Sequence, residues 1–168
     1  MKTACYENYP LWIVLMSNAV SILIYLIGAF IFLQLGAVYA IFYVAYVVFL
    51  EFRLLTHSCK YCYYHGKTCA FGRGRCSKII TKKGDPRKFI RKNITLKDML
   101  PDFLVFILPM IAGAALLVSS FSWTILIMMV LLLVMSTGGN AFIRGSYACK
   151  YCKQGKIGCP ALKVFSKR

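Results

Sequence analysis

The sequence has few charged residues, and very few of them are acidic. Only 15% of its 168 residues are charged, whereas a soluble domain of ordinary composition has about 25%. Five residues are acidic against 21 that are basic, and 60% of the chain is hydrophobic. A disordered chain is also excluded, because such chains are poor in aromatic residues and this one has 12 Phe and 11 Tyr. The composition therefore indicates a membrane protein.

Two long apolar stretches, 11–52 and 103–143, contain no Lys, Arg or His. As one helix, the first would be about 60 Å long, roughly twice the thickness of the hydrocarbon core. Each stretch must therefore fold back. Residues that favour a turn, polar side chains and glycine, occur at 34–36 and 119–123. Four transmembrane helices are predicted, near 11–33, 37–54, 103–119 and 123–143.

The absence of ionisable residues within these spans excludes two kinds of function. A haem held between two histidines in the bilayer has no ligands there. The only carboxylate in a span is Glu51, near the end of the second, which argues against an ion-coupled transporter. An aromatic stripe on the second span, Tyr39, Tyr43, Tyr46 and Phe49, fits helix packing better than a quinone or lipid site.

All the basic residues lie on one side of this four-span arrangement. Lys2 precedes the first span, and the others lie in the loop 53–102 or in the tail after Ile143. The positive-inside rule then predicts a multi-pass protein of the cell membrane with both termini in the cytoplasm. Anionic membrane lipids are expected partners of these charges. The stretch 78–97 is expected to lie on the membrane, with these side chains toward the lipid: Ile79, Ile80, Phe89, Ile90 and Ile94.

The chain also contains an internal repeat. A shift of about 90 residues places Cys59-Lys60-Tyr61-Cys62 on Cys149-Lys150-Tyr151-Cys152, and Cys69 on Cys159. The first copy is residues 1–92, with a hairpin 11–54 and a Cys-rich basic loop 55–92. The second copy is residues 93–168, with a hairpin 103–143 and a Cys-rich tail 144–168. The predicted fold is an all-α membrane protein with two tandemly repeated hairpins, each followed by a cytoplasmic Cys-rich segment.

The eight cysteines all lie outside the spans, on the side predicted to be reducing. Clustered cysteines in a reducing compartment are typical of metal ligands or catalytic thiols rather than disulfides. The candidate ligands are Cys59, Cys62, Cys69 and Cys76 in the first copy, and Cys149, Cys152, Cys159 and, from the amino-terminal arm, Cys5 in the second. Thiolates of this kind suit zinc or an iron–sulfur cluster. His57 and His65 are substitute ligands, and thiols packed as small hydrophobic groups are the alternative.

The metal sites predict either a zinc-organised docking surface or an iron–sulfur electron relay, with a soluble cytoplasmic protein as candidate partner. Two alternatives stay open. Basic residues beside the thiols favour thiolates, which would suit a membrane-surface enzyme acting on a lipid or quinone, with no catalytic residue singled out. A small carrier of soft metal ions would use methionines in the spans, although these also serve as core filler: Met16, Met110, Met128, Met129 and Met135.

Other motifs carry less information. The stretch 72–75, Gly-Arg-Gly-Arg, could cradle a phosphate through its amides, but two glycines are a weak signal. No recognition motif supports binding of nucleic acid. Two hairpins make a thin bundle, which is compatible with an oligomer.

Overall fold

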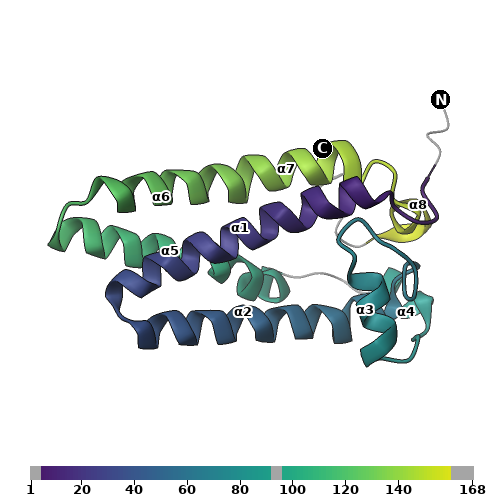
Figure 1. The fold of residues 1–168 in the computed structure, drawn as a ribbon. Coiled ribbons are helices and arrows are strands. Elements are labelled where there is room, and N and C mark those ends of the chain that lie inside the picture. Colours follow the sequence, from purple (N-terminus) through teal and green to yellow (C-terminus); the bar gives the residue numbers. More distant parts are fainter. Residues whose placement is uncertain (1–4, 92–95, 160–168) are drawn as a thin grey trace.

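The computed structural model describes residues 5–91 and 96–159, which form four long helices with a group of short segments at one end (Figure 1). The long helices are α1 (Leu11–Leu35), α2 (Ala37–His57), α5 (Leu96–Ser119) and α6 (Trp123–Val134). These two described ranges contain no β-strand, and the all-helical prediction is confirmed.

Four helical stretches are long and apolar enough to cross a membrane, which confirms the predicted number of spans. The third helix was expected to begin near residue 103, but it begins at Leu96 and takes Pro101 into its second turn. Proline has no N–H, so at this position the helix loses only one hydrogen bond, the one to a carbonyl in its first turn. An acidic residue in the first turn, Asp98, also favours this earlier start.

The fourth span also departs from its predicted end at residue 143. It continues from α6 through a π-helical turn (Met135–Gly139), the short α7 (Asn140–Phe142) and a second π-helical turn (Ile143–Ala148). The last turn closes when the Cys149 amide donates to the Arg144 carbonyl at 2.7 Å. The helix therefore places Cys149 directly at its end.

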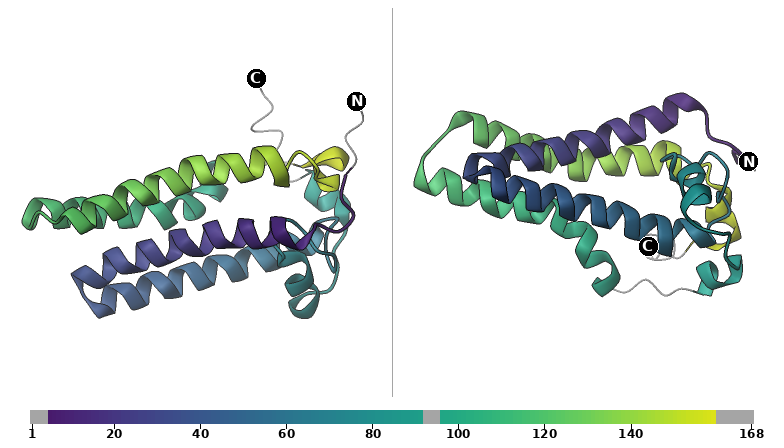
Figure 2. Two further views of the ribbon diagram at one scale, coloured as in Figure 1. Left: turned by 45° about the horizontal axis from the view of Figure 1, so that its top comes forward. Right: turned by 60° about the horizontal axis from the view of Figure 1, so that its bottom comes forward.

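The two hairpin turns lie at one end of the molecule, and all the cysteine-bearing segments lie at the other (Figures 1 and 2). Gly36 makes the first turn with a positive φ of 141°, which favours glycine. The opposite end is called the cap below, and it consists of residues 5–10, 58–91 and 149–159. Two turns at one end and the cap at the other are what the predicted pair of hairpins requires.

The apolar core is centred on α1, which packs against α2, α5 and α6, whereas α2 and α5 meet at few positions. The left view of Figure 2 shows the two hairpins as two layers, α1 with α2 and α5 with α6. Buried side chains from all four helices form this core, among them Ile24, Ile31, Tyr43, Val105 and Leu132. Four of the methionines considered as soft donors pack against it: Met110, Met128, Met129 and Met135.

The tyrosine stripe on α2 joins the two hairpins. Pro109 has no N–H to offer the carbonyl of Val105, and the Tyr43 hydroxyl donates to that carbonyl instead, at 2.9 Å. The Tyr46 hydroxyl likewise donates to the Pro101 carbonyl at 2.9 Å. These two tyrosines therefore act in helix packing, and Tyr39 lies exposed on the apolar surface.

A cysteine-rich cap and its ion pair

Three chain segments far apart in sequence build the cap. The loop after α2 forms α3 (Arg73–Ile80) and α4 (Pro86–Arg91), and the tail forms α8 (Lys153–Gly158). Figure 1 shows these short helices gathered at one end of the bundle, with the amino-terminal arm beside α8. A second apolar cluster holds the segments together, and its members include Tyr9, Tyr64, Ala70, Ala148, Cys62, Cys69 and Cys152.

The amino-terminal arm lies between the two cysteine segments. The Tyr6 amide donates to the Tyr151 carbonyl at 3.2 Å, and Tyr6 and Cys152 form an isolated parallel bridge. The buried Tyr64 hydroxyl donates to the Tyr6 carbonyl at 2.6 Å and accepts from the Lys153 amide at 3.0 Å. A single phenol from the first segment therefore bridges the arm and the second segment.

Gln154 provides a further direct link between the two cysteine segments. It is one of the few polar side chains in the described chain that are buried. Its Oε1 accepts from the Tyr63 amide at 2.7 Å, while its Nε2 donates to the Gly158 carbonyl at 3.0 Å. Because both ends of the side chain are paired, its burial carries no desolvation penalty from an unmade bond. The contact fixes the start of α8 beside the first C-x2-C turn.

The two C-x2-C turns have the same local geometry. In the first, the Cys62 amide donates to the Cys59 carbonyl at 3.2 Å, and in the second the Cys152 amide donates to the Cys149 carbonyl, also at 3.2 Å. The second cysteine of each turn is extended, with φ of −77° at Cys62 and −80° at Cys152. The backbone amides of the residues that follow each turn lie close to the sulfur of its second cysteine.

Those amides donate to the sulfurs. Tyr64 N–H donates to Cys62, and the N–H groups of Gln154 and Gly155 donate to Cys152. Burial nevertheless raises the pKa of Cys62 to about 12, and the nearby thiols of Cys152, Cys59 and Cys69 add to the rise. Burial also raises the pKa of Cys152, with its neighbours Cys149 and Cys159 contributing. In this arrangement both sulfurs are protonated thiols at neutral pH.

The sequence-predicted ligands form two neighbourhoods. Cys59, Cys62 and Cys69 lie near one another in the first, and Cys149, Cys152 and Cys159 in the second, while Cys62 and Cys152 connect the two. Cys76 on α3 and Cys149 are exposed, and Cys5 is half-buried in the arm. Across residues 5–91 and 96–159, no three Cys, His, Asp or Glu side chains come close enough to share one ion.

The two histidines considered as substitute ligands have other surroundings. His57 is exposed at the end of α2. The His65 ring lies within hydrogen-bond distance of the Thr81 carbonyl, with Nε2 at 3.0 Å. His65 therefore holds the chain that follows α3.

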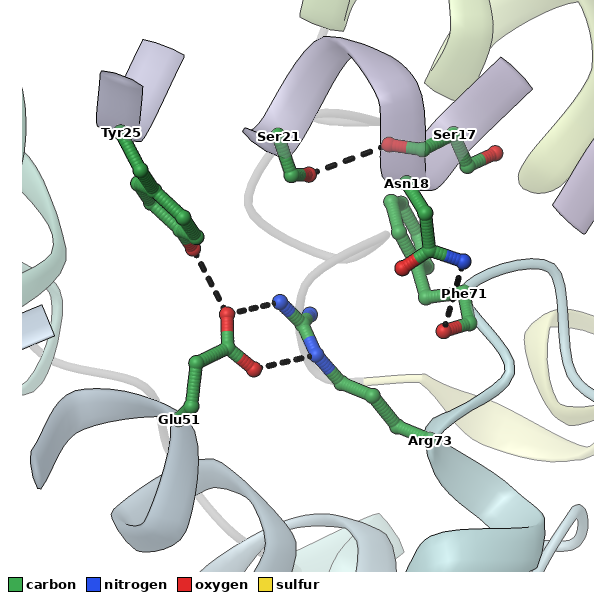
Figure 3. Close-up of polar contacts among 7 residues, drawn as sticks. All are labelled: Ser17, Asn18, Ser21, Tyr25, Glu51, Phe71 and Arg73. Carbon is green, nitrogen blue, oxygen red and sulfur yellow. Dashed lines mark hydrogen bonds and ion pairs between the residues drawn. The ribbon is translucent and has the colours of Figure 1, made fainter. Parts of the chain in front are cut away.

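A half-buried ion pair connects the cap to the first hairpin (Figure 3). The Arg73 guanidinium, at the start of α3, donates through Nε to Glu51 Oε2 at 2.7 Å and through Nη2 to Oε1. The Tyr25 hydroxyl of α1 donates to the same Oε1 at 2.6 Å. Burial disfavours the charge on Arg73, but Glu51 outweighs it and raises the pKa of Arg73, with a smaller contribution from Cys59. Glu51 is thus a paired carboxylate within a span, not an isolated one.

The loop that carries Arg73 enters between the helices. Asn18 Nδ2 of α1 donates to the Phe71 carbonyl at 3.4 Å, next to the ion pair in Figure 3. Gly72 has a φ of 69° and faces Asn18 and Val14, and a Cβ on Gly74 would lie 2.2 Å from the Tyr64 carbonyl oxygen. The glycines of the Gly-Arg-Gly-Arg stretch therefore permit close packing of this loop, and the phosphate-cradle interpretation is not needed to explain them.

An exposed ionic cluster lies on the outer side of the cap. Lys153 Nζ donates to Glu7 Oε1 at 2.7 Å, and Lys67 Nζ donates to the Tyr63 hydroxyl at 3.0 Å. The hydrogen bond from Lys153 lowers the pKa of Glu7, and the hydrogen bonds from Lys67 and Lys153 lower the pKa of Tyr63. Because these groups are open to solvent, the cluster contributes little to stability.

The stretch expected on the membrane surface has both exposed and packed apolar side chains. Ile79 is 87% exposed and Ile80 45% exposed at the end of α3. Ile90, by contrast, packs against Gly158 of the second segment. Ile94 lies outside the described residues.

Three residues of the site were not singled out in the sequence: Arg73 as an ion-pair partner, Tyr64 and Gln154. A signal for the first was available, since Glu51 is a lone carboxylate in an apolar span and must find a cation. Tyr64 and Gln154 gave no signal, because their roles depend on which segments the fold brings together. Comparison of the chain with protein-family models, with curated proteins and with solved structures gives no match.

Proposed function

We propose that the protein is a multi-pass membrane protein whose cap binds soft metal through cysteine thiolates, with the cap in the cytoplasm. The observation that carries this proposal is the pair of C-x2-C turns, which share one hydrogen-bonded geometry. In each turn the second sulfur accepts backbone N–H groups. Amides directed at sulfur favour the thiolate, which is the form that binds metal.

The donor set suits zinc or an iron–sulfur cluster. The first neighbourhood supplies Cys59, Cys62 and Cys69, with Cys76 close by on α3. The second supplies Cys149, Cys152 and Cys159, and the Tyr6–Tyr151 hydrogen bond brings the arm that carries Cys5 to it. The equal turn geometry also supports a tandem duplication of the hairpin-plus-cysteine unit.

Binding must draw each set of thiols together. No three ligating groups of the described chain lie at coordination distance, and the thiol of Cys62 titrates only at about 12. A metal ion overcomes such a pKa by displacing the proton, so that binding energy is used to close the turn. Metal binding is therefore expected to release protons and to tighten the cap.

Two observations favour this proposal over the alternatives. A thiol enzyme needs a low-pKa, accessible cysteine, whereas burial raises the pKa of Cys62 and Cys152. A soft-metal carrier needs free donors in the spans, and Met110, Met128, Met129 and Met135 pack into the core. The basic residues at the cap end fit its placement on the cytoplasmic side beside anionic lipids.

The test is the metal content and visible absorbance of the full chain, purified without oxygen in a mild detergent. We expect at least one equivalent of zinc, or of iron with sulfide and a charge-transfer absorbance, per chain. The double variant Cys59→Ser/Cys62→Ser should remove the metal of the first neighbourhood only. Cys149→Ser/Cys152→Ser should remove that of the second only.

The matched control is Tyr61→Phe, within the first turn, whose hydroxyl forms no hydrogen bond with residues 5–91 or 96–159 and is not a ligand. Its metal content should equal that of the unmodified chain. Less than one equivalent of any metal per unmodified chain, with the helices intact by circular dichroism, would remove the proposal.

A further inference from the structure

We propose that Arg73, held by Glu51 and Tyr25, positions the Cys69–Cys76 segment, so that the thiols of the cap and the packing of the first hairpin are linked. The inference deepens the proposed function, on which it rests for the role of the thiols. The link itself is a property of the fold and can be tested in the protein without metal.

The first step is the placement of Arg73 in the chain. It lies between two of the candidate ligands, four residues after Cys69 and three before Cys76. Three hydrogen-bond contacts attach this short segment to the long helices. Asn18 of α1 contacts the Phe71 carbonyl, Glu51 of α2 contacts Arg73, and the Ser77 hydroxyl donates to the Leu55 carbonyl of α2 at 3.3 Å.

The second step is the cost of breaking the central contact. Both partners are half-buried, with side chains 21% and 28% exposed. Removal of one partner is destabilising, because the other charge then stays partly desolvated without compensation. The two hydrogen bonds between guanidinium and carboxylate also fix the direction of Arg73. The ion pair therefore holds the segment in one position.

The third step is the neighbour of Arg73 on its other side. Cys59 lies near enough to Arg73 for each group to shift the pKa of the other. Arg73 therefore pairs with a carboxylate of the first hairpin and has a thiol of the first C-x2-C turn nearby. Binding or modification of the Cys59 thiol changes the surroundings of Arg73 in the cap. A shift of α1 or α2 changes the position of Glu51 and Tyr25, and with it the position of Arg73. Such a link acts equally in both directions.

The experiment measures alkylation rates of individual cysteines by a maleimide in the full chain in lipid nanodiscs. Peptide mass spectrometry assigns each rate to its cysteine. Glu51→Gln and Tyr25→Phe should each accelerate labelling of Cys59 and Cys69, by about tenfold for Glu51→Gln and less for Tyr25→Phe. The control is Glu7→Gln, which breaks the exposed pair with Lys153 and should leave these two rates unchanged.

Variants of Arg73 distinguish a requirement for its positive charge from a general loss of packing. Arg73→Lys keeps the charge and should restore most of the protection that Arg73→Gln loses. Tyr25→Phe removes a single hydroxyl and serves where Glu51→Gln fails to fold. Rates at Cys59 and Cys69 within twofold of the unmodified chain in both Glu51→Gln and Tyr25→Phe would overturn the inference. A chain that binds no metal but shows the accelerated labelling would refute the proposed function and leave this inference standing.

Discussion

The two cysteine segments share a turn but differ in how they are attached. The first, 58–91, is joined to the long helices directly, through Arg73 to Glu51 and through Phe71 to Asn18. The second, 149–159, continues from the last helix, and hydrogen bonds join it to the arm and to the first segment. One segment is therefore held by the bundle, and the other is held by its partner segment.

This difference indicates an order of dependence within the cap. Loss of the first segment removes Tyr64 and the Tyr63 amide, to which the second segment is bound. Loss of the second leaves the contacts of the first to α1 and α2 in place. The predictions below test this asymmetry, beginning with the largest expected effect.

The largest effect concerns the reactivity of Cys62 in the first segment. Maleimide reacts with the thiolate, so its rate follows the thiolate fraction. With a pKa of about 12, that fraction should rise about tenfold for each pH unit from 8 to 10, because the pH stays below the pKa throughout. At pH 8 we expect Cys62 to react at least ten times more slowly than Cys76, which is exposed on the same segment.

The measurement is residue-resolved labelling of the metal-free chain at pH 8, 9 and 10. Cys62 labelling that levels off below pH 10 would contradict the raised pKa. Equal rates for Cys62 and Cys76 at pH 8 would show that the first segment opens readily, and the contrast between the two segments would then fail.

The next effect concerns the bridge made by Tyr64. Tyr64→Phe removes the bond to the Tyr6 carbonyl and leaves that carbonyl and the Lys153 amide without their partner. The expected cost is about 1–3 kcal/mol, because buried groups are left unpaired. Hydrogen exchange should therefore speed up in residues 151–158 by about tenfold, while the segment around Arg73 keeps its protection.

Tyr61→Phe is the matched control for this variant, since both are tyrosines of the first segment. It should leave exchange in residues 151–158 unchanged. Faster exchange around Arg73 in Tyr64→Phe would contradict the asymmetry, because it would show that the first segment depends on the second.

The long elements of the fold could be predicted from sequence, because apolar length alone determines how many helices can cross a bilayer. The number of spans followed from the length of the two apolar stretches. The positions of both turns followed from the polar residues and glycine within them. The ends of the third and fourth helices did not follow. Pro101 is a poor stop signal near a helix start, and no residue pattern marked the two π-helical turns that extend the fourth span to Cys149.

The candidate site could be predicted only as a set of residues. The spacing of the cysteines predicted two related turns, and the two turns do share a geometry. Nothing in the spacing indicated that Tyr6 would lie beside Tyr151, or that Gln154 would accept from the Tyr63 amide. These contacts join residues about 90 to 145 positions apart, and such pairing is decided by the tertiary fold.

The smallest effect concerns the contact between the hairpins that carry the two segments. Tyr43→Phe leaves the Val105 carbonyl without a donor, because Pro109 cannot supply one. A hydrogen bond within a membrane contributes about 0.6 kcal/mol on average, so we expect a loss of about that size in unfolding by sodium dodecyl sulfate in bicelles. Tyr39→Phe, on the same helix but exposed, should have no effect. Equal losses in the two variants would mean that the bond to Val105 does not join the hairpins, and the Tyr46 bond and the apolar core would then join them without it.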